Sequence, residues 1–168
     1  MFDSKTITAE QLAGMFDHTN LRAYAVEEDF RALCREAAEN GYAMVAINPG
    51  PVKLCRQLLE GTGVHVGAAI SFPLGQTTTE EKLSETLNAI RDGAQEIDYV
   101  INVGDLKMGR LDRVRNEMEA IVRVCRENGV ISKVIFEICY LTEEEIRQAL
   151  GDPQEVTVRL HARDEIAD

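Results

Sequence analysis

The sequence predicts an α/β protein built on a parallel β-sheet. Helix and strand signals alternate regularly along the chain, which is typical of βα units. The predicted strands are near-continuous apolar runs, as expected of parallel strands covered on both faces. Two of them carry a charged residue inside the apolar run, Asp98 and Lys133. We count five βα units, and the pattern alone leaves open whether the sheet closes into a barrel or stays open, as in flavodoxin-like folds.

Sequence patterns in the first half of the chain predict three of these βα units. A short helix over residues 9–15 precedes a first strand over 16–19. Acidic residues in the first turn open a helix over 27–40, because the helix dipole favours negative charge there. The elements expected next are a buried strand, a helix and a second buried strand, over residues 43–48, 51–61 and 64–72.

Sequence patterns in the second half of the chain predict two further βα units. Thr78 and Glu81 fit a capping box at the start of a helix that ends near Arg91, and Thr142 and Glu145 fit another that opens the last helix. Between them we expect a strand, a long helix and a strand, over residues 96–103, 111–128 and 132–139.

The chain changes character after Leu150. Residues 155–160 alternate polar and apolar side chains, the pattern of a half-exposed edge strand, and residues 161–168 are mostly polar and expected to fray. We therefore expect one folded domain over residues 1–150 and a divergent tail over 151–168.

Composition excludes several classes of partner. The net charge of −11 argues against nucleic acid or an anionic membrane surface, although local amides and lysines can still hold a small phosphorylated substrate. No apolar run approaches a membrane span, and the first residues lack an apolar signal core, so we expect a cytoplasmic protein. The four cysteines and three histidines are isolated from one another, which favours reduced thiols and predicts no metal site.

The two charged strand residues are the strongest candidates for chemistry. Side chains alternate across a strand, so Asp98 and Lys133 can point at a common interior if their strands are neighbours. Such an acid–base pair suits proton transfer next to a carbonyl carbon. A purely structural buried ion pair fits the same charge pattern. Asp17 is also ambiguous, because it could join a proton relay or simply accept hydrogen bonds at a strand end.

Five segments of the chain match one known family in order and spacing, from about residue 10 to residue 149. They read DHTNLR, AINP, SFPLG, EIDYVIN and KVIFEICYLT, at residues 17–22, 46–49, 71–75, 96–102 and 133–142. On these motifs the chain resembles deoxyribose-phosphate aldolase, a class I aldolase family whose fold is a (β/α)8 TIM barrel.

The resemblance implies a reaction and a set of site residues. The family cleaves 2-deoxyribose 5-phosphate to glyceraldehyde 3-phosphate and acetaldehyde through a Schiff base, without metal or organic cofactor. By resemblance, Asp98 is the acid/base aspartate, Lys133 lines the same site, and Asp17 supports it. The substrate-binding residues that the resemblance implies are Thr19, Asn48 and Asn102.

The family motif KTSTGF, which carries the Schiff-base lysine on the sixth strand, has no counterpart here. Lys133 is the last lysine of the sequence, and a complete barrel of this kind needs about 250 residues. We therefore expect about five βα units of the barrel, exposed sheet edges that favour a homo-oligomer, and no activity from the isolated chain. Two alternatives remain open: a non-catalytic half-barrel module, and another Schiff-base or retro-aldol activity that uses Lys133.

Overall fold

The computed structural model describes residues 6–150, which form one parallel sheet flanked by helices. The strands are β1 Asp17–Asn20, β2 Met44–Ile47, β3 His65–Ile70, β4 Glu96–Val100 and β5 Ile131–Ile135. They lie in chain order, β1-β2-β3-β4-β5, and every neighbouring pair is parallel. A flavodoxin-like sheet reverses its strand order, so the consecutive order identifies a singly wound, barrel-type sheet. The predicted α/β class and five units are confirmed.

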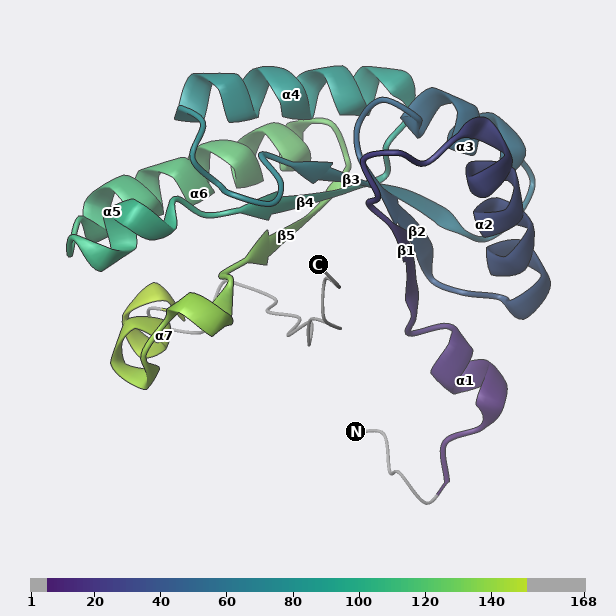
Figure 1. Ribbon diagram of the computed structural model, residues 1–168, viewed down its shortest axis with the longest axis horizontal. Helices are drawn as coiled ribbons and strands as arrows, with labels where there is room; N and C mark the ends of the chain where they lie inside the picture. The colour runs from purple at the N-terminus through teal and green to yellow at the C-terminus, as the bar shows by residue number, and fades with distance from the viewer. Residues whose placement is uncertain (1–5, 151–168) are drawn as a thin grey trace.

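Four helices that lie between successive strands in the chain cover one side of this sheet (Figure 1). They are α2 Glu27–Asn40, α3 Val52–Leu58, α4 Thr79–Asp92 and α6 Leu111–Glu127. The other helical elements of the described chain are α1 Ala9–Ala13, α5 Val103–Lys107, the 3-10 helix η1 Ile138–Tyr140 and α7 Glu143–Leu150. The sheet curves away from the helices, which leaves a concave face on its other side (Figure 1).

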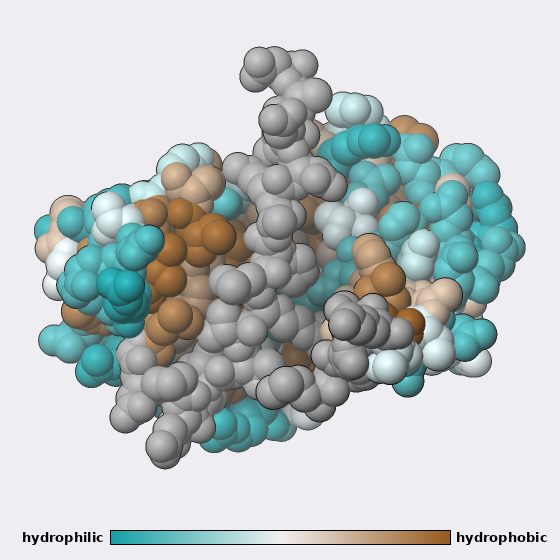
Figure 2. Space-filling view, turned by 90° about the horizontal axis from the view of Figure 1, so that it is seen from below, coloured by the Kyte–Doolittle hydropathy of each residue, from teal (hydrophilic) through white to brown (hydrophobic). Residues whose placement is uncertain are grey.

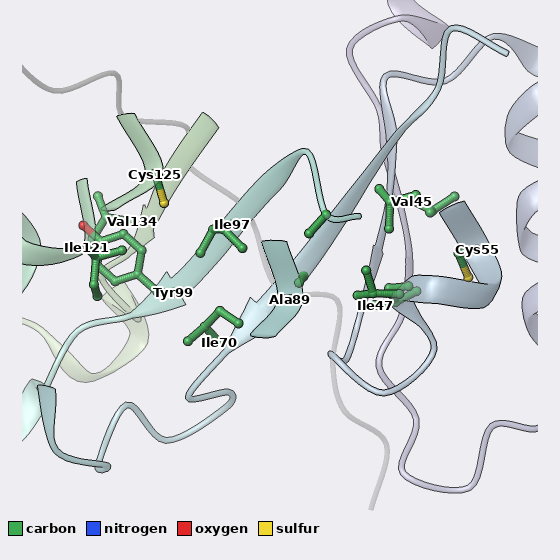
Figure 3. Close-up of a cluster of buried hydrophobic side chains, with 14 of the residues drawn as sticks. Val45, Ile47, Cys55, Ile70, Ala89, Ile97, Tyr99, Ile121, Cys125 and Val134 are labelled. Atoms are coloured by element: carbon green, nitrogen blue, oxygen red, sulfur yellow. The ribbon is translucent and has the colours of Figure 1, made fainter. Parts of the chain in front are cut away.

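Strand alternation sends one set of side chains to the helices and the other set to the concave face. Apolar side chains of the first set pack with helix residues such as Cys55, Ala89 and Ile121 into the main core (Figure 3). The strand residues labelled in that core are Val45, Ile47, Ile70, Ile97, Tyr99 and Val134. Asp98 and Lys133 belong to the other set, so they face the concave side.

Two predicted strands end three or four residues earlier than the sequence pattern indicated. β4 ends at Val100 because Asn102 caps α5, its Oδ1 accepting a hydrogen bond from the amide of Asp105 at 3.1 Å. β5 ends at Ile135, and Glu137 adopts a left-handed backbone conformation with φ of 55°. The strand expected over 132–139 was therefore wrong at its end, and Cys139 lies in η1 instead.

The capping signals located both predicted helix starts, but Thr78 shows only the N-cap half of its predicted box: its Oγ1 accepts from the Glu81 amide at 3.3 Å. At Thr142 the amide donates to Glu145 Oε2 at 2.7 Å, and the Glu145 amide donates back to Thr142 Oγ1 at 3.3 Å, which is a complete capping box. The predicted edge strand over 155–160 and the frayed end lie outside the described residues. Among residues 6–150, no helix combines the length and the apolar character that crossing a membrane requires.

Candidate active site

The three residues predicted to be catalytic meet on the concave face. Lys133 Nζ donates a hydrogen bond to Asp17 Oδ2 at 3.0 Å and forms an ion pair with Asp98 Oδ1, also at 3.0 Å. Asp98 and Lys133 are direct partners in the β4–β5 register, which explains their contact. Asp17 lies on β1, at the opposite edge of the sheet, so only the curvature of the sheet brings it to Lys133.

Two further residues complete what we call the concave-face cluster: Asp17, Met44, Glu96, Asp98 and Lys133. Glu96 Oε2 lies 3.3 Å from Lys133 Nζ, and Met44 Sδ accepts a hydrogen bond from the same ammonium at 3.0 Å. Strand alternation from Asp98 would have predicted Glu96, since the two are separated by one residue. Met44 gave no signal, because a methionine in an apolar strand normally indicates core packing.

Gly67 of β3 makes room for Met44. A Cβ atom at Gly67 would lie 2.6 Å from Met44 Cε and 2.8 Å from Met44 Sδ, which is closer than van der Waals contact. The absent side chain therefore lets the thioether lie across β3 and reach Lys133.

The cluster is buried and carries more negative than positive groups. The side chains of Asp17 and Asp98 are 4% and 11% exposed, and that of Lys133 is 7% exposed. Three carboxyl groups surround a single ammonium, so an ionised cluster has a formal excess of negative charge. Burial of unbalanced charge is costly, which favours protonation of one carboxylate.

Asp98 is the group that titrates near neutrality. Burial raises the pKa of Asp98 to about 6, the Lys133 ammonium opposes this rise, and the charges of Asp17 and Glu96 add to it. Burial works against the Lys133 ammonium too, but the carboxylates of Asp98, Asp17 and Glu96 outweigh it and raise the pKa of Lys133. The pair thus combines a persistent cation with a carboxyl group suited to giving and taking protons at neutral pH.

This shift predicts how stability depends on pH. The folded chain binds the Asp98 proton more tightly than the unfolded chain, so the stability that depends on protonated Asp98 is full below the ordinary pKa of 3.8 and is lost as pH rises through about 6. An asparagine side chain at this position cannot titrate. As pH rises from below 3.8 to above 6, the unfolding free energy of Asp98→Asn should therefore increase relative to that of wild type, by roughly 3 kcal/mol in total.

Urea unfolding of both proteins across this pH range measures the gain. Asp112→Asn is a matched control, because the Asp112 side chain is 94% exposed and should give no pH-dependent difference. A constant difference between wild type and Asp98→Asn would contradict the shifted pKa.

The three predicted substrate-binding residues lie near the carboxyl ends of their strands. Thr19 Oγ1 donates to the carbonyl of Asp17 at 2.9 Å, and Asn48 Nδ2 donates to the carbonyl of Leu21 at 3.3 Å. Asn102 uses its Oδ1 to cap α5. Barrel enzymes build their sites at this edge of the sheet, but the substrate-binding role of all three stays a prediction.

A second buried ion pair lies on the helix side and was missed by sequence reasoning. Lys82 Nζ donates at 2.8 Å both to Glu117 Oε1 and to the carbonyl of Val100, while the amide of Asn102 donates to Glu117 Oε1 at 3.2 Å. Burial lowers the pKa of Lys82, and Glu117 opposes that effect. The spacing along α4 could have indicated that Lys82 is buried, because Lys82 lies on the same face of the helix as buried Thr86 and Ala89. This pair fixes the point at which β4 ends, beside Asn102.

Metal binding has no support in the described part of the chain. Across residues 6–150, no group of three or more His, Cys, Asp or Glu side chains is arranged to hold a metal ion. The groups that the concave-face cluster offers for chemistry are one ammonium and three carboxyl groups.

Comparisons with known proteins agree on one family. Residues 11–165 match the family model described as DeoC/LacD family aldolase. A curated deoxyribose-phosphate aldolase of Bacteroides thetaiotaomicron is 55% identical over 139 residues, which cover 83% of this chain and 58% of the relative. That of Lactobacillus acidophilus is 48% identical over 149 residues, covering 89% of this chain and 63% of the relative.

A solved structure gives the same result. Deoxyribose phosphate aldolase from Aeropyrum pernix, described as a tetramer, matches with a TM-score of 0.78 at 33% identity, over 85% of this chain and 59% of that one. The chain thus spans about three fifths of the length of these relatives.

Proposed function

Because the chain belongs to the DeoC/LacD family of aldolases, we propose that its concave-face cluster supplies the proton-transfer part of a deoxyribose-phosphate aldolase site. The reaction is the reversible cleavage of 2-deoxyribose 5-phosphate to glyceraldehyde 3-phosphate and acetaldehyde. The observation that carries the proposal is the position of Lys133 Nζ, which lies 3.0 Å from a carboxylate oxygen of both Asp98 and Asp17.

The roles follow from the charges of these groups. Retro-aldol cleavage needs a base to take the proton of the sugar hydroxyl and an acid to return a proton to the carbon fragment. Asp98, with its pKa near neutrality, can do both in turn. Lys133 stabilises the ionised form of Asp98, and Asp17 holds the Lys133 ammonium in place. Thr19, Asn48 and Asn102 are proposed to contact the substrate at the adjoining strand ends.

Carbon–carbon cleavage by a class I aldolase also needs a neutral amine that forms an imine. Lys133 is the last lysine in the sequence, and the comparison covers only about three fifths of each relative. We propose that the amine comes from the part of the relatives that this chain does not match. The 168 residues alone are then expected to bind protons at the site without cleaving the sugar.

Reconstitution tests this proposal. The chain is mixed with the carboxyl-terminal segment of the Bacteroides thetaiotaomicron relative, the part that lies beyond the matched 58%. Cleavage of 2-deoxyribose 5-phosphate is expected from the mixture and from neither component. Asp98→Asn should lower the rate by about 10²–10⁴-fold, the usual contribution of a positioned acid or base.

A control variant and two contrary results complete the reconstitution test. Asp112→Asn, at an exposed position on α6, should leave the reconstituted rate unchanged. If the two segments associate but give no activity, or if Asp98→Asn is as active as wild type, the proposed role of the cluster is wrong. The non-catalytic half-barrel module would then be favoured.

Imine formation at Lys133 itself is the second candidate, and the geometry disfavours it. Attack on a carbonyl requires an unprotonated amine, whereas three carboxylates raise the pKa of Lys133 and hold it as an ammonium. Treatment of the chain with acetaldehyde and sodium borohydride is therefore expected to leave Lys133 unmodified, as read by mass spectrometry of its peptide. A reduced ethyl adduct on Lys133 would instead support a Schiff-base activity of this chain alone.

We also propose that the chain forms a homo-oligomer through its sheet edges. In the described sheet, β1 and β5 each pair with only one neighbour. Both edges begin with an exposed large apolar side chain, Phe16 just before β1 and Ile131 at the start of β5. Hydrophobic residues, coloured brown, are also visible on the underside of the molecule (Figure 2). Light scattering decides between an oligomer and a monomer. The cytoplasmic location expected from the sequence stays a prediction.

A further inference from the structure

A continuous row of titratable groups connects the concave-face cluster with the protein surface. His65 Nδ1 lies 2.8 Å from Glu96 Oε1, and the other oxygen of the same carboxyl group, Oε2, lies 3.3 Å from Lys133 Nζ. Lys133 in turn contacts Asp98 Oδ1 at 3.0 Å. The His65 side chain is 40% exposed, whereas Glu96 and Lys133 are each 7% exposed. The row therefore begins in solvent and ends at the proposed acid–base aspartate.

The position of the row in the sheet separates it from the expected substrate side. His65 is the first residue of β3 and Glu96 the first residue of β4, so both lie at the amino-terminal edge of the parallel sheet. Barrel enzymes bind substrate at the opposite, carboxyl-terminal edge. The proposed cleavage gives Glu96 no step of its own and does not involve His65.

We propose that His65 and Glu96 form a proton-transfer path that links the Lys133–Asp98 pair to solvent at the amino-terminal edge of the sheet. The inference rests on the proposed function for its purpose, because Asp98 must start each cleavage as a carboxylate and the path lets it exchange its proton with solvent between turnovers. The path itself is a property of the described chain and needs no substrate.

The transfer can be written with every proton accounted for. Lys133 gives one ammonium proton to Asp98 Oδ1 as it takes another from the carboxyl group of Glu96, so it is an ammonium before and after the step. His65 in its neutral Nδ1–H tautomer takes a proton at Nε2 from a hydronium ion and gives its Nδ1 proton to Glu96 Oε1, which leaves the Nε2–H tautomer. A half-turn of the Glu96 carboxyl group then presents that proton to Lys133, and the reverse sequence restores the Nδ1–H tautomer. The net result is the movement of one proton from solvent to Asp98, and the reverse sequence releases it.

A merely structural role for His65 makes the opposite prediction. If His65 only holds Glu96 in place, its loss loosens the cluster and admits water to the Lys133 ammonium. Hydrogen exchange at Lys133 Nζ would then be faster, or unchanged when the replacement still donates a hydrogen bond to Glu96. A proton path predicts slower exchange instead.

The experiment measures exchange of the Lys133 ammonium protons with water by nitrogen-15 NMR of the full chain. His65→Gln can still donate a hydrogen bond to Glu96 but cannot relay a proton. We expect it to slow exchange at Lys133 by roughly a hundredfold, the lower end of what a positioned acid or base contributes. The ammonium of Lys82, fully buried against Glu117 on the helix side, is an internal control whose exchange should not change.

A matched variant and a rescue complete the test. His18→Gln removes the imidazole from a similar pair, in which His18 Nε2 lies 2.9 Å from Glu36 Oε2. In the described chain neither residue of that pair forms a hydrogen bond or ion pair with Lys133, so the change should have no effect on exchange at Lys133. In His65→Ala, added imidazole should restore the faster exchange of wild type. Unchanged or faster exchange at Lys133 in His65→Gln, or no response to imidazole in His65→Ala, would overturn the path. Neither result depends on whether reconstituted cleavage occurs, so the two proposals fail separately.

Discussion

Replacement of Lys133 by methionine is expected to destabilise the fold by about 3–5 kcal/mol, the usual cost of breaking a buried ion pair from one side. Methionine nearly matches the length of the lysine stem, so lost packing contributes little. The variant leaves the carboxyl groups of Asp17, Glu96 and Asp98 together in a buried site without their cation. Lys133 also joins the two edge strands through Asp17, so its loss removes this contact between β1 and β5. Urea unfolding at neutral pH measures the effect.

The pH dependence of Lys133→Met identifies its cause. Lys133 lowers the pKa of Asp98 against the effect of burial, so its removal should raise that pKa further above 6. The destabilisation is then full above this higher pKa and shrinks as pH falls through it, because protonation removes the unpaired charge. Lys107→Met is the control: Lys107 pairs with Glu145 at the surface, where solvent screens the charges, so its loss should change the unfolding free energy far less than Lys133→Met does. Equal costs in the two variants would show that charge at the concave face does not support the fold.

Much of the fold could be predicted from local signals. The helix over 27–40 was predicted to the residue, since acidic residues open it and Gly41 in a left-handed conformation ends it. Strand ends were harder, because an apolar run does not show where pairing stops. β4 ends two residues before Asn102, whose side chain begins α5, and nothing in the apolar pattern of this run distinguishes Asn102 from a strand residue.

The candidate site shows the same division between local and tertiary information. Alternation along two strands was enough to predict that Asp98 and Lys133 share a face, and their ion pair at 3.0 Å confirms this placement. The contact between Asp17 and Lys133 joins residues 116 positions apart on opposite edges, so it depends on how strongly the sheet curves. Curvature is a property of the packed sheet and helices together. Sequence reasoning could reach that contact only through the family resemblance.

Lys82→Met is expected to cost a similar amount, about 3–5 kcal/mol, by a different mechanism. Lys82 is fully buried on the helix side, where its ammonium satisfies both Glu117 and the carbonyl of Val100. The variant leaves a buried carboxylate and a buried carbonyl without that donor. Urea unfolding measures the loss, and Arg31→Met, at an exposed ion pair with Glu27 on α2, should change the unfolding free energy by less than about 1 kcal/mol.

The double variant Lys82→Met, Glu117→Leu separates charge from packing. Replacing both members of a buried pair by apolar residues is often neutral, because no uncompensated charge remains. We expect the double variant to recover most of the stability that Lys82→Met loses. The amide of Asn102 still loses its acceptor, so residual destabilisation should be confined to the end of β4, read as faster amide hydrogen exchange at Asn102. If the double variant is instead destabilised by the sum of the two single substitutions, the stability does not depend on the pairing of Lys82 with Glu117.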